Sequence, residues 1–414
     1  IFIHKIYVYF HQKTLHHVNI NLHTTSKNPQ NRLFMISQSL AINSFQPSRR
    51  TLMGPGPSDV SNRVLDAMAR PTLGHLDPEF ISMMNETKEL LQYVFQTKND
   101  WTFAVSAPGS AGMECCFANM VEPGDKVIVC QNGVFGGRMR ENVERCGGIP
   151  IMVTDPWGCP VDPEKVEAAL KDHPDTSLVA FVHAETSTGV RSDAERLTQL
   201  AHDFGCLVIV DSVTGLVGSP LLVDDWKIDA IYSGTQKCLS APPGLSPISF
   251  NDAAAEKIRS RKSKVQSWFL DLNLIMGYWG GDTKRSYHHT APVNCLYGLH
   301  ESLIIVNEEG LEAGWARHQD NHAYLKAGLK DLGIEFLVDE SFRLPQLNSV
   351  IIPDGVDDAV VRSRLLEEFS LEIGAGLGEL AGKVWRIGLM GHSSNTKNVD
   401  YCLSALKFIL KEVS

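Results

Sequence analysis

One lysine, Lys237, occupies a position at which a side chain could do chemistry. It lies in the stretch Ala230 to Gly244, AIYSGTQKCLSAPPG, where a short apolar run ends, a lysine follows and a Pro-Pro-Gly turn begins. An ammonium at the end of a buried strand is partly desolvated, which lowers its pKa towards a nucleophilic amine. The stretch therefore predicts a Schiff-base lysine, and the alternative is an ordinary solvated lysine in a loop.

An aspartate precedes this lysine at the end of another apolar run. Residues 206–213 read CLVIVDSV, and runs that are apolar on both faces are typical of a parallel sheet covered by helices. Ligands of such sheets bind beyond the carboxyl ends of the strands, so Asp211 and Lys237 should face one crevice. This arrangement suits pyridoxal 5'-phosphate, because the carboxylate would keep the pyridinium nitrogen protonated while the lysine holds the aldehyde as an imine.

Several further motifs occur in an order that resembles a known family. The segments are GPGPSD at 54–59, HAETSTGV at 183–190, DSV at 211–213, YSGTQKCLSAPPG at 232–244, YHHT at 287–290 and WRIGLMG at 385–391. From about Leu52 to the C-terminus they resemble the alanine:glyoxylate (serine:pyruvate) aminotransferases, which are fold-type I pyridoxal phosphate enzymes. The 3-hydroxykynurenine transaminases of insects share these motifs. The resemblance implies transamination between a small L-amino acid, alanine or serine, and glyoxylate or pyruvate.

The resemblance also implies which residues contact the cofactor. Besides Lys237 and Asp211, which would be catalytic, they are Gly109, Ser110, Phe135, Thr186, Gln236, Tyr287 and Thr290. The phosphate cup would lie where a helix starts near Ala111, because free N–H groups and the helix dipole favour an anion there. Pro108 stands where the family has a serine and offers neither hydroxyl nor N–H. Phe135 stands where the family usually has Trp, and it keeps a ring that can stack on the cofactor.

Two residues are implied to bind the substrate. Arg386 lies in the WRIGLMG strand, where its planar guanidinium could bind a carboxylate through two hydrogen bonds. A structural ion pair is the alternative that the residue type alone leaves open. Gly56, in the turn-rich GPGPSD segment, would lie against the substrate. Thr186 would donate to the phenolate oxygen of the cofactor, although Ser/Thr clusters are also common in ordinary turns.

The YHHT segment implies a homodimer with shared active sites. In the family this loop reaches across the dimer interface, so Tyr287 and Thr290 would bind the phosphate in the neighbouring subunit. The adjacent His288 and His289 could suggest a metal site. Neighbouring side chains on an extended segment point in opposite directions, and no third ligand is evident, so no metal is expected.

The apolar patterns predict alternating strands and helices. Strands are expected at 103–106, 126–130, 149–153, 178–183 and 207–210, and helices at 78–95, 163–171 and 193–204. Such alternation is typical of a doubly wound, mostly parallel α/β sheet. We expect a large cofactor-binding domain over 51–296 and a smaller C-terminal α/β domain over 297–414. The smaller domain would begin with one long helical stretch over 297–332 and include a strand at 334–338.

Composition excludes several other classes of protein. The formal net charge is −10, so nothing favours a nucleic-acid partner. No run approaches the roughly 18 apolar residues of a membrane span. The nine cysteines contain no C-x-x-C pair, which argues against a zinc site and a disulfide framework. Reduced thiols in an intracellular compartment are therefore expected.

The N-terminal extension, residues 1–50, differs from the rest of the chain. It contains Lys and Arg but no Asp or Glu, a composition typical of a mitochondrial transit peptide. Alternatively Met35 is the initiator and the remaining extension is a short presequence or a disordered arm. The final residues, KEVS, do not form a peroxisomal Ser-Lys-Leu ending. We expect a mitochondrial protein, with a peroxisomal or cytosolic location as the alternative.

Two rival functions remain open at this point. Fold-type I relatives that perform desulfuration or lyase chemistry share the aspartate and the lysine, but desulfuration requires a mobile nucleophilic cysteine. An inactive cofactor-binding scaffold is the second rival, because Pro108 and Phe135 depart from the family pattern. The preferred amino donor, alanine, serine or 3-hydroxykynurenine, depends on small differences in the pocket that the sequence does not reveal.

Overall fold

The computed structural model describes residues 42–280 and 285–413. Contacts divide the chain into one unit that ends at Ser48 and a second from Arg49 to Ser414. In the first unit, residues 42–48 contain no helix or strand. The predicted transit peptide falls mainly on residues 1–41, outside the described ranges, and the cellular location stays a prediction. Within the described ranges, no helix is both long and apolar enough to cross a membrane.

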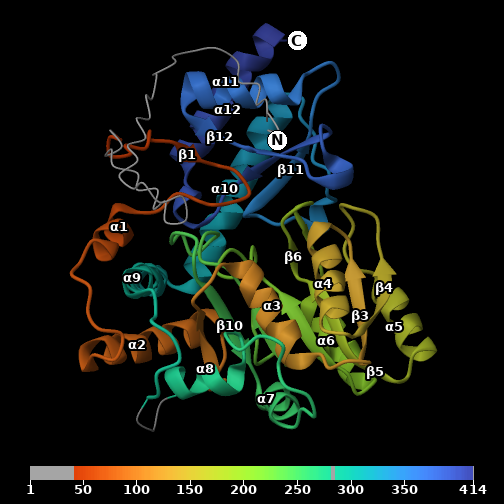
Figure 1. The fold of residues 1–414 in the computed structure, drawn as a ribbon. Helices are drawn as coiled ribbons and strands as arrows, with labels where there is room; N and C mark the ends of the chain where they lie inside the picture. Colours follow the sequence, from red (N-terminus) through yellow and green to blue (C-terminus); the bar gives the residue numbers. More distant parts are fainter. Residues whose placement is uncertain (1–41, 281–284, 414) are drawn as a thin grey trace, which may run out of the picture. The chain divides into compact units, whose positions relative to one another are not determined.

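A seven-stranded sheet lies at the centre of the second unit (Figure 1). Its strands, in spatial order, are β2 (Trp101–Val105), β10 (Ser246–Phe250), β9 (Ala230–Tyr232), β8 (Leu207–Asp211), β5 (Thr176–Val182), β3 (Lys126–Gln131) and β4 (Ile149–Thr154). β10 is antiparallel to both of its neighbours, and the other pairs are parallel. β2, β9 and β10 are buried along their whole length and β3, β5 and β8 along most of it, as a sheet with covered faces requires. Only Val153 of the edge strand β4 is buried.

Helices follow most of these strands. In this part of the chain the helices are α1 (Asn62–Met68), α2 (Pro78–Phe95), α3 (Gly109–Met120), α4 (Val134–Arg145), α5 (Pro163–Asp172), α6 (Ala194–Asp203), α7 (Asp252–Arg259), α8 (Leu272–Trp279) and α9 (Val293–Glu309). Helices α2 to α7 contact strands of the sheet, and α1 packs mainly on α9. Aspartate N-caps begin α2, α5 and α6, where Asp77, Asp162 and Asp193 each accept a hydrogen bond from a backbone N–H of the first turn. The predicted helices 78–95, 163–171 and 193–204 are confirmed to within about a residue.

A second, smaller sheet of three antiparallel strands lies in the C-terminal part of this unit. It consists of β11 (Leu347–Ile351), β14 (Val384–Gly388) and β13 (Gly374–Ala375). Around it lie α10 (Leu311–Asp331), α11 (Asp358–Phe369), α12 (Thr396–Val413) and the 3-10 helices η1 (Glu340–Phe342), η2 (Gly378–Leu380) and η3 (Gly391–Ser393). Two short ribbons complete the fold, β1 (Thr51–Leu52) beside β12 (Leu371–Glu372) and β6 (Ala184–Glu185) beside β7 (Val190–Arg191).

The apolar core forms two clusters of buried residues. One surrounds the seven-stranded sheet, and the other lies among α10, α11, α12 and the three-stranded sheet. The clusters do not follow the order of the sequence strictly, because Met53 joins the second cluster and Leu347 the first. The predicted division at residues 296 and 297 stays a prediction. The α/β architecture with a mostly parallel central sheet confirms the predicted fold class.

The structure differs from the predicted elements in the C-terminal part. The expected single helical stretch over 297–332 is two helices, because Gly310, at φ +81°, separates α9 from α10. Glycine tolerates this left-handed region and therefore permits the break. The expected strand at 334–338 is reduced to an isolated bridge between Phe336 and Val350. The short helices α1 and α8 were not predicted, since periodicity does not identify elements of this length.

Candidate active site

Asp211 is the last residue of β8 and is paired with Tyr232 at the end of β9. Its Oδ1 accepts a hydrogen bond from the backbone N–H of Val213 at 2.9 Å, and its Oδ2 accepts one from the Tyr232 hydroxyl at 2.8 Å. Burial raises the pKa of Asp211 to about 6, while these two hydrogen bonds act in the opposite direction. The carboxylate is thus fixed in orientation and can still accept a donor from a ligand.

Lys237 follows β9 and is only 8% exposed. Its Nζ donates to the carbonyl oxygen of Pro55. Burial lowers the pKa of Lys237 to about 8, and the neighbouring Arg386 guanidinium lowers it further. No carboxylate among the described residues forms a salt bridge with this amine, so it can act as a base or a nucleophile near neutral pH. Lys237 and Asp211 influence each other's pKa, which places them in one electrostatic cluster.

Gly56 packs directly against this lysine. A Cβ atom at Gly56 would lie 2.5 Å from Nζ of Lys237 and 2.7 Å from its Cδ. The glycine also has φ +105°, a region that residues with a Cβ rarely adopt. Ser58 holds the same segment to the lysine loop, since its Oγ donates to the carbonyl oxygen of Lys237 at 2.7 Å. The predicted substrate-binding glycine therefore lies beside the predicted catalytic amine.

Arg386 lies in the middle of β14 and is 5% exposed. Its Nε donates to the carbonyl oxygen of Ala375 at 2.8 Å, and its Nη1 donates to that of Thr186 at 2.9 Å. Burial lowers the pKa of Arg386 to about 10, against the influence of the Glu185 carboxylate. Within the described ranges it forms no salt bridge, which argues against the structural ion pair that the sequence left open. Backbone carbonyls hold the guanidinium in place and leave its positive charge for a ligand.

Two further predicted residues lie next to these groups. Thr186, whose carbonyl binds Arg386, places its Oγ1 2.5 Å from Oγ1 of Thr214. Gln236, directly before Lys237, has a buried Oε1 that makes no hydrogen bond to any described residue. A buried polar atom without a partner is costly unless a ligand or water satisfies it. Gln236 is therefore oriented as a ligand-binding side chain would be.

The predicted phosphate cup is the start of α3. Pro108 is the N-cap and provides no side-chain hydrogen bond, so the first N–H groups of the helix lack a side-chain acceptor. Gly109 packs close to the end of β9, since a Cβ there would lie 3.4 Å from the carbonyl oxygen of Ser233. Ser110 is exposed. The helix start thus lies beside the strand ends that carry Asp211. The Ala111 N–H donates to the carbonyl oxygen of Pro108 at 2.7 Å, and a helix start favours an anion near its first N–H groups.

Glu185 has a role that sequence reasoning missed. It is fully buried, and its Oε1 accepts hydrogen bonds from the N–H of Ser187 at 2.9 Å and from its Oγ at 2.6 Å. Its Oε2 accepts from the N–H of Phe135 at 3.3 Å. Burial raises the pKa of Glu185 to about 7. Glu185 therefore joins the Thr186 turn to the start of α4, where Phe135 lies. The sequence feature that could have indicated this role is an acidic residue between a buried strand and a Ser/Thr turn.

The YHHT segment does not join this cluster within one chain. Tyr287 is 63% exposed and its ring lies 5.3 Å from that of His75, while Thr290 is exposed. The expectation that His288 and His289 point in opposite directions is wrong, because their Nδ1 atoms lie 2.8 Å apart. The segment belongs to no described strand, so the alternation of a strand does not apply to it.

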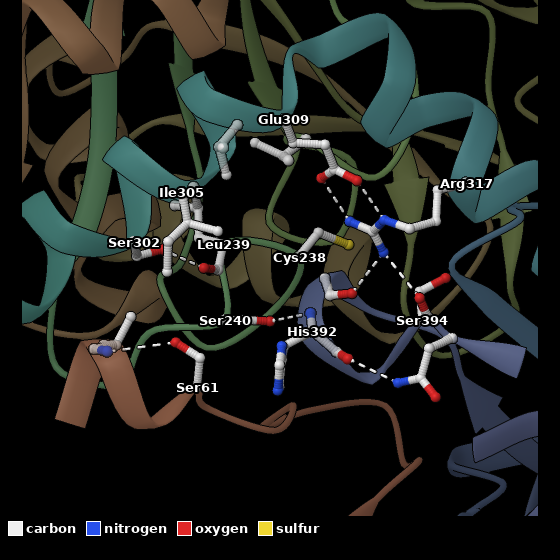
Figure 2. A pocket seen from close by; sticks show the side chains of 15 residues that line it. Ser61, Cys238, Leu239, Ser240, Ser302, Ile305, Glu309, Arg317, His392 and Ser394 are labelled. Carbon is white, nitrogen blue, oxygen red and sulfur yellow. Dashed lines mark hydrogen bonds and ion pairs between the residues drawn. The ribbon is translucent and has the colours of Figure 1, made fainter. Parts of the chain in front are cut away.

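A cavity of about 380 Å³ lies behind the lysine loop (Figure 2). Cys238, Leu239 and Ser240 line it, whereas Lys237 and Asp211 do not. Figure 2 shows Arg317 clamped between Glu309 and the backbone at one end of this cavity. Burial raises the pKa of Cys238 to about 12, so the cysteine next to the lysine is a protonated thiol. A protonated, buried thiol does not suit the mobile nucleophile that desulfuration requires.

Comparisons with known proteins agree with this geometry. Residues 53–384 match the family described as aminotransferase class-V. An alanine–glyoxylate aminotransferase from Callithrix jacchus is 42% identical, over 87% of this chain and 88% of the relative. An (S)-ureidoglycine–glyoxylate transaminase from Bacillus subtilis is 39% identical, over 87% of this chain and 90% of the relative. The crystal structure of an alanine–glyoxylate aminotransferase from Nostoc sp. superposes with a TM-score of 0.88 at 46% identity, covering 90% of this chain and 98% of that one. The chain therefore belongs to the class-V aminotransferases.

Proposed function

We propose that this transaminase transfers the amino group of L-alanine to glyoxylate, with pyridoxal 5'-phosphate bound at Lys237. The observation that carries the proposal is the buried cluster of Lys237, Asp211 and Arg386, in which neither cation has a carboxylate partner among the described residues. Buried titratable groups with displaced pKa values and unused binding capacity are typical of active sites. The relatives named alanine–glyoxylate aminotransferase support the choice of substrates.

The residues present fit this cofactor. Gln236 offers a buried acceptor without a partner, and the start of α3 offers N–H groups without a side-chain cap. Asp211 offers a fixed, buried carboxylate whose oxygens are bound only by neutral donors. Asp211 would hold the ring nitrogen of the cofactor, and Lys237 would bind its aldehyde. Gly109, Ser110 and Gln236 would hold its phosphate, Phe135 would cover its ring, and Thr186 would bind its ring hydroxyl.

The chain's own residues divide the reaction between them. Pyridoxal phosphate, when bound, supplies a carbonyl that receives the amino group and a ring that disperses the negative charge formed at the substrate Cα. Arg386 binds the substrate carboxylate and so orients Cα. Lys237, as the neutral amine favoured by its burial, removes the proton from Cα at its Nζ. The buried Asp211 carboxylate stabilises the positive charge of the protonated ring nitrogen. Gly56 leaves the space in which the lysine side chain moves.

A homodimer with shared active sites is part of the proposal. Tyr287 and Thr290, which are exposed in one chain, would contact the phosphate in the neighbouring subunit. Trp268 supports an interface here, because it is 64% exposed although it stacks on His288. Large exposed aromatic side chains are enriched at protein interfaces. We expect the purified protein to sediment as a dimer. We expect Tyr287→Ala to sediment as a monomer or to lose the cofactor.

The assay that tests the activity measures glycine formed from glyoxylate with L-alanine as donor. L-serine and 3-hydroxykynurenine are tested in parallel, with pyruvate as the second acceptor, because one small change in the pocket can alter donor preference. We expect alanine with glyoxylate to give the highest kcat/KM. A preference for 3-hydroxykynurenine would replace the proposed donor, and a protein that binds pyridoxal phosphate but turns over no donor would be the inactive scaffold.

A further inference from the structure

A second cavity, of about 220 Å³, lies away from the catalytic cluster. It is formed where the β6–β7 ribbon meets α10 and the segment around η1. Its lining consists of Arg191, Gln319, His322, Ala323, Lys326, Glu340, Ser341 and Arg343. Among the described residues this lining does not include Lys237, Asp211 or Arg386. The cavity is therefore independent of the transamination chemistry.

Cations outnumber anions around this cavity. Arg191, Lys326 and Arg343 face a single carboxylate in the lining, that of Glu340. Glu340 is already in a salt bridge with Lys326, with an N–O distance of 2.5 Å. In the part of the chain that the structure describes, the guanidinium of Arg191 makes no hydrogen bond or salt bridge, and Arg343 makes no salt bridge. Two guanidinium groups and one ammonium therefore line a cavity with a single carboxylate, and that carboxylate is bound by Lys326. The charge of Arg343 also acts on Glu340 and on the neighbouring Asp339, so positive charge is in excess but not uncompensated.

Arg343 is held in position rather than free in solvent. Its Nε donates to the carbonyl oxygen of Val338 at 2.7 Å, and its guanidinium lies 4.2 Å from the ring centroid of Phe336. These contacts fix the plane of the group and leave both Nη atoms for other partners. The neighbouring His322 is held through Nδ1, 2.6 Å from Oδ1 of Asn348. Burial lowers the pKa of His322, and the charges of Arg343 and Lys326 act in the same direction, whereas the hydrogen bond to Asn348 and the charge of Glu340 act against them.

We propose that this cavity binds a small doubly charged oxyanion, a phosphate group or a short dicarboxylate, with Arg191 and Arg343 as its principal ligands. A planar guanidinium presents parallel N–H donors that match the oxygen pairs of phosphate and carboxylate. The volume suits a group of a few heavy atoms, because drug-sized ligands occupy pockets of about 300 Å³ or more. Lys326 adds a third positive charge, and Ser341 adds a polar side chain at the rim.

The position of the cavity gives the bound anion a mechanical effect. Arg191 is the last residue of β7 and pairs with Ala184 of β6, and between these strands lies the turn that carries Thr186. Arg343 is bridged to Val190, the residue before Arg191, so the backbone already joins this ribbon to the segment that follows η1. An anion held by both arginines adds a second link at the same place. Because it binds the folded protein and not the unfolded chain, an anion at concentration c raises the free energy of unfolding by RT ln(1 + c/Kd).

The test uses protein saturated with pyridoxal phosphate and inorganic phosphate as the probe. Titration calorimetry is performed at constant ionic strength, and the melting temperature is recorded at the same phosphate concentrations. We expect Arg191→Gln to weaken phosphate binding about tenfold or more and to shift the rise in melting temperature to phosphate concentrations about tenfold higher or more. Arg191 is exposed and its side chain makes no hydrogen bond within the described protein, so this variant should fold. Arg343→Gln provides the second ligand variant.

Lys330→Gln is the matched control. Lys330 lies on the same helix, α10, is exposed, and does not line the cavity, so its removal changes net charge equally without changing the site. Succinate replaces phosphate in a second series, and the tighter of the two anions identifies the ligand class. Binding of equal strength in Arg191→Gln and wild type would overturn the proposal, as would the absence of binding by both anions at millimolar concentration. Neither readout depends on transamination, so these results are separate from the proposed activity.

Discussion

Two polar regions of this protein, one half-buried and one buried, differ in how completely the protein satisfies them. In the first, Arg317 donates to both carboxylate oxygens of Glu309 and to the carbonyl oxygens of Gly391 and Ser394. The adjacent His318 also has a partner at each ring nitrogen. In the second, the catalytic crevice, the cation of Lys237 has no carboxylate partner among the described residues. Satisfied buried charges stabilise one arrangement, whereas unsatisfied ones keep their binding energy for a ligand.

The largest effect is expected when the amine of Lys237, the crevice cation that pairs with no described carboxylate, is removed. Lys237→Ala should reduce kcat for alanine and glyoxylate by about 10⁴-fold or more, because the proton at Cα loses its acceptor. The melting temperature of the cofactor-free variant should stay close to that of the cofactor-free wild type, since no protein anion loses a partner. Steady-state assays and thermal unfolding measure the two effects. Lys264→Ala, at an exposed lysine, is the control, and near wild-type turnover in Lys237→Ala would refute the assignment.

A smaller loss is expected at the substrate carboxylate. Arg386→Gln should lower kcat/KM for alanine by about 10²- to 10³-fold, as the loss of one partner of a buried charge pair costs several kcal/mol. An amine substrate without a carboxylate should react equally poorly with wild type and variant. Arg364→Gln, which breaks only the salt bridges with Glu368 and Glu412, should leave both rates unchanged. If the variant discriminates between alanine and the amine as wild type does, Arg386 does not bind the carboxylate.

Glu185 provides a test between the two regions, because it is buried near the crevice and is satisfied by the protein. Glu185→Gln places an amide where the carboxylate accepts from Ser187 and Phe135, so at least one N–H loses its acceptor at a cost of about 1–3 kcal/mol. We expect about tenfold weaker binding of pyridoxal phosphate, measured by equilibrium dialysis, with little change in the dimer. Glu367→Gln, on exposed α11, is the control. Unchanged cofactor affinity would show that the link to Phe135 has no effect on the site.

The smallest effect concerns the satisfied region and acts on stability alone. Burial lowers the pKa of His318 to about 4 from 6.5, so between these values the unfolded chain binds a proton that the folded chain does not. The free energy of unfolding must therefore fall as pH drops from 6.5 towards 4, by at most about 3 kcal/mol from this residue.

His318→Gln removes this titrating group. Urea unfolding between pH 4.5 and 8 should show a flatter decline on acidification than in wild type, and kcat at pH 8 should change by less than about twofold. The decline should not vanish, because His183 and His289 also have pKa values lowered to about 4. A decline as steep as that of wild type would show that His318 does not contribute to it.

Much of the fold could be predicted from local pattern. Long amphipathic helices with Asp caps, such as α2, and apolar strands, such as β8, are specified by residues close in sequence. The reversed direction of β10 could not be predicted, because its pairing with β2 depends on residues far apart in the chain. The break at Gly310 was hidden inside a helical pattern that continues on both sides. One glycine within such a pattern is tolerated often enough to give no clear signal.

Residues of the candidate site could be predicted where the role depends on the type of side chain, and were missed where it depends on contacts with the backbone. Lys237, Asp211 and Arg386 have side chains whose chemistry is rare at strand ends or inside strands, and the structure brings them together. Glu185 was missed, because its role depends on the backbone N–H of Phe135, which a sequence does not place beside it. The orientation of His288 was mispredicted for the same reason: a rule for strands was applied to a segment that belongs to none.

The order of strands in the central sheet has a consequence for biosynthesis. β2 is an edge strand whose partner in the sheet is β10, and α3, with the predicted phosphate cup, follows β2 directly. The cup therefore cannot reach its final place until the ribosome has completed Phe250. Until then β2, in which Thr102 is the one polar residue, has no partner on a growing chain, a situation in which chaperones bind and aggregation competes with folding. Nascent chains that end before Ser246 should accordingly be the ones most dependent on chaperones.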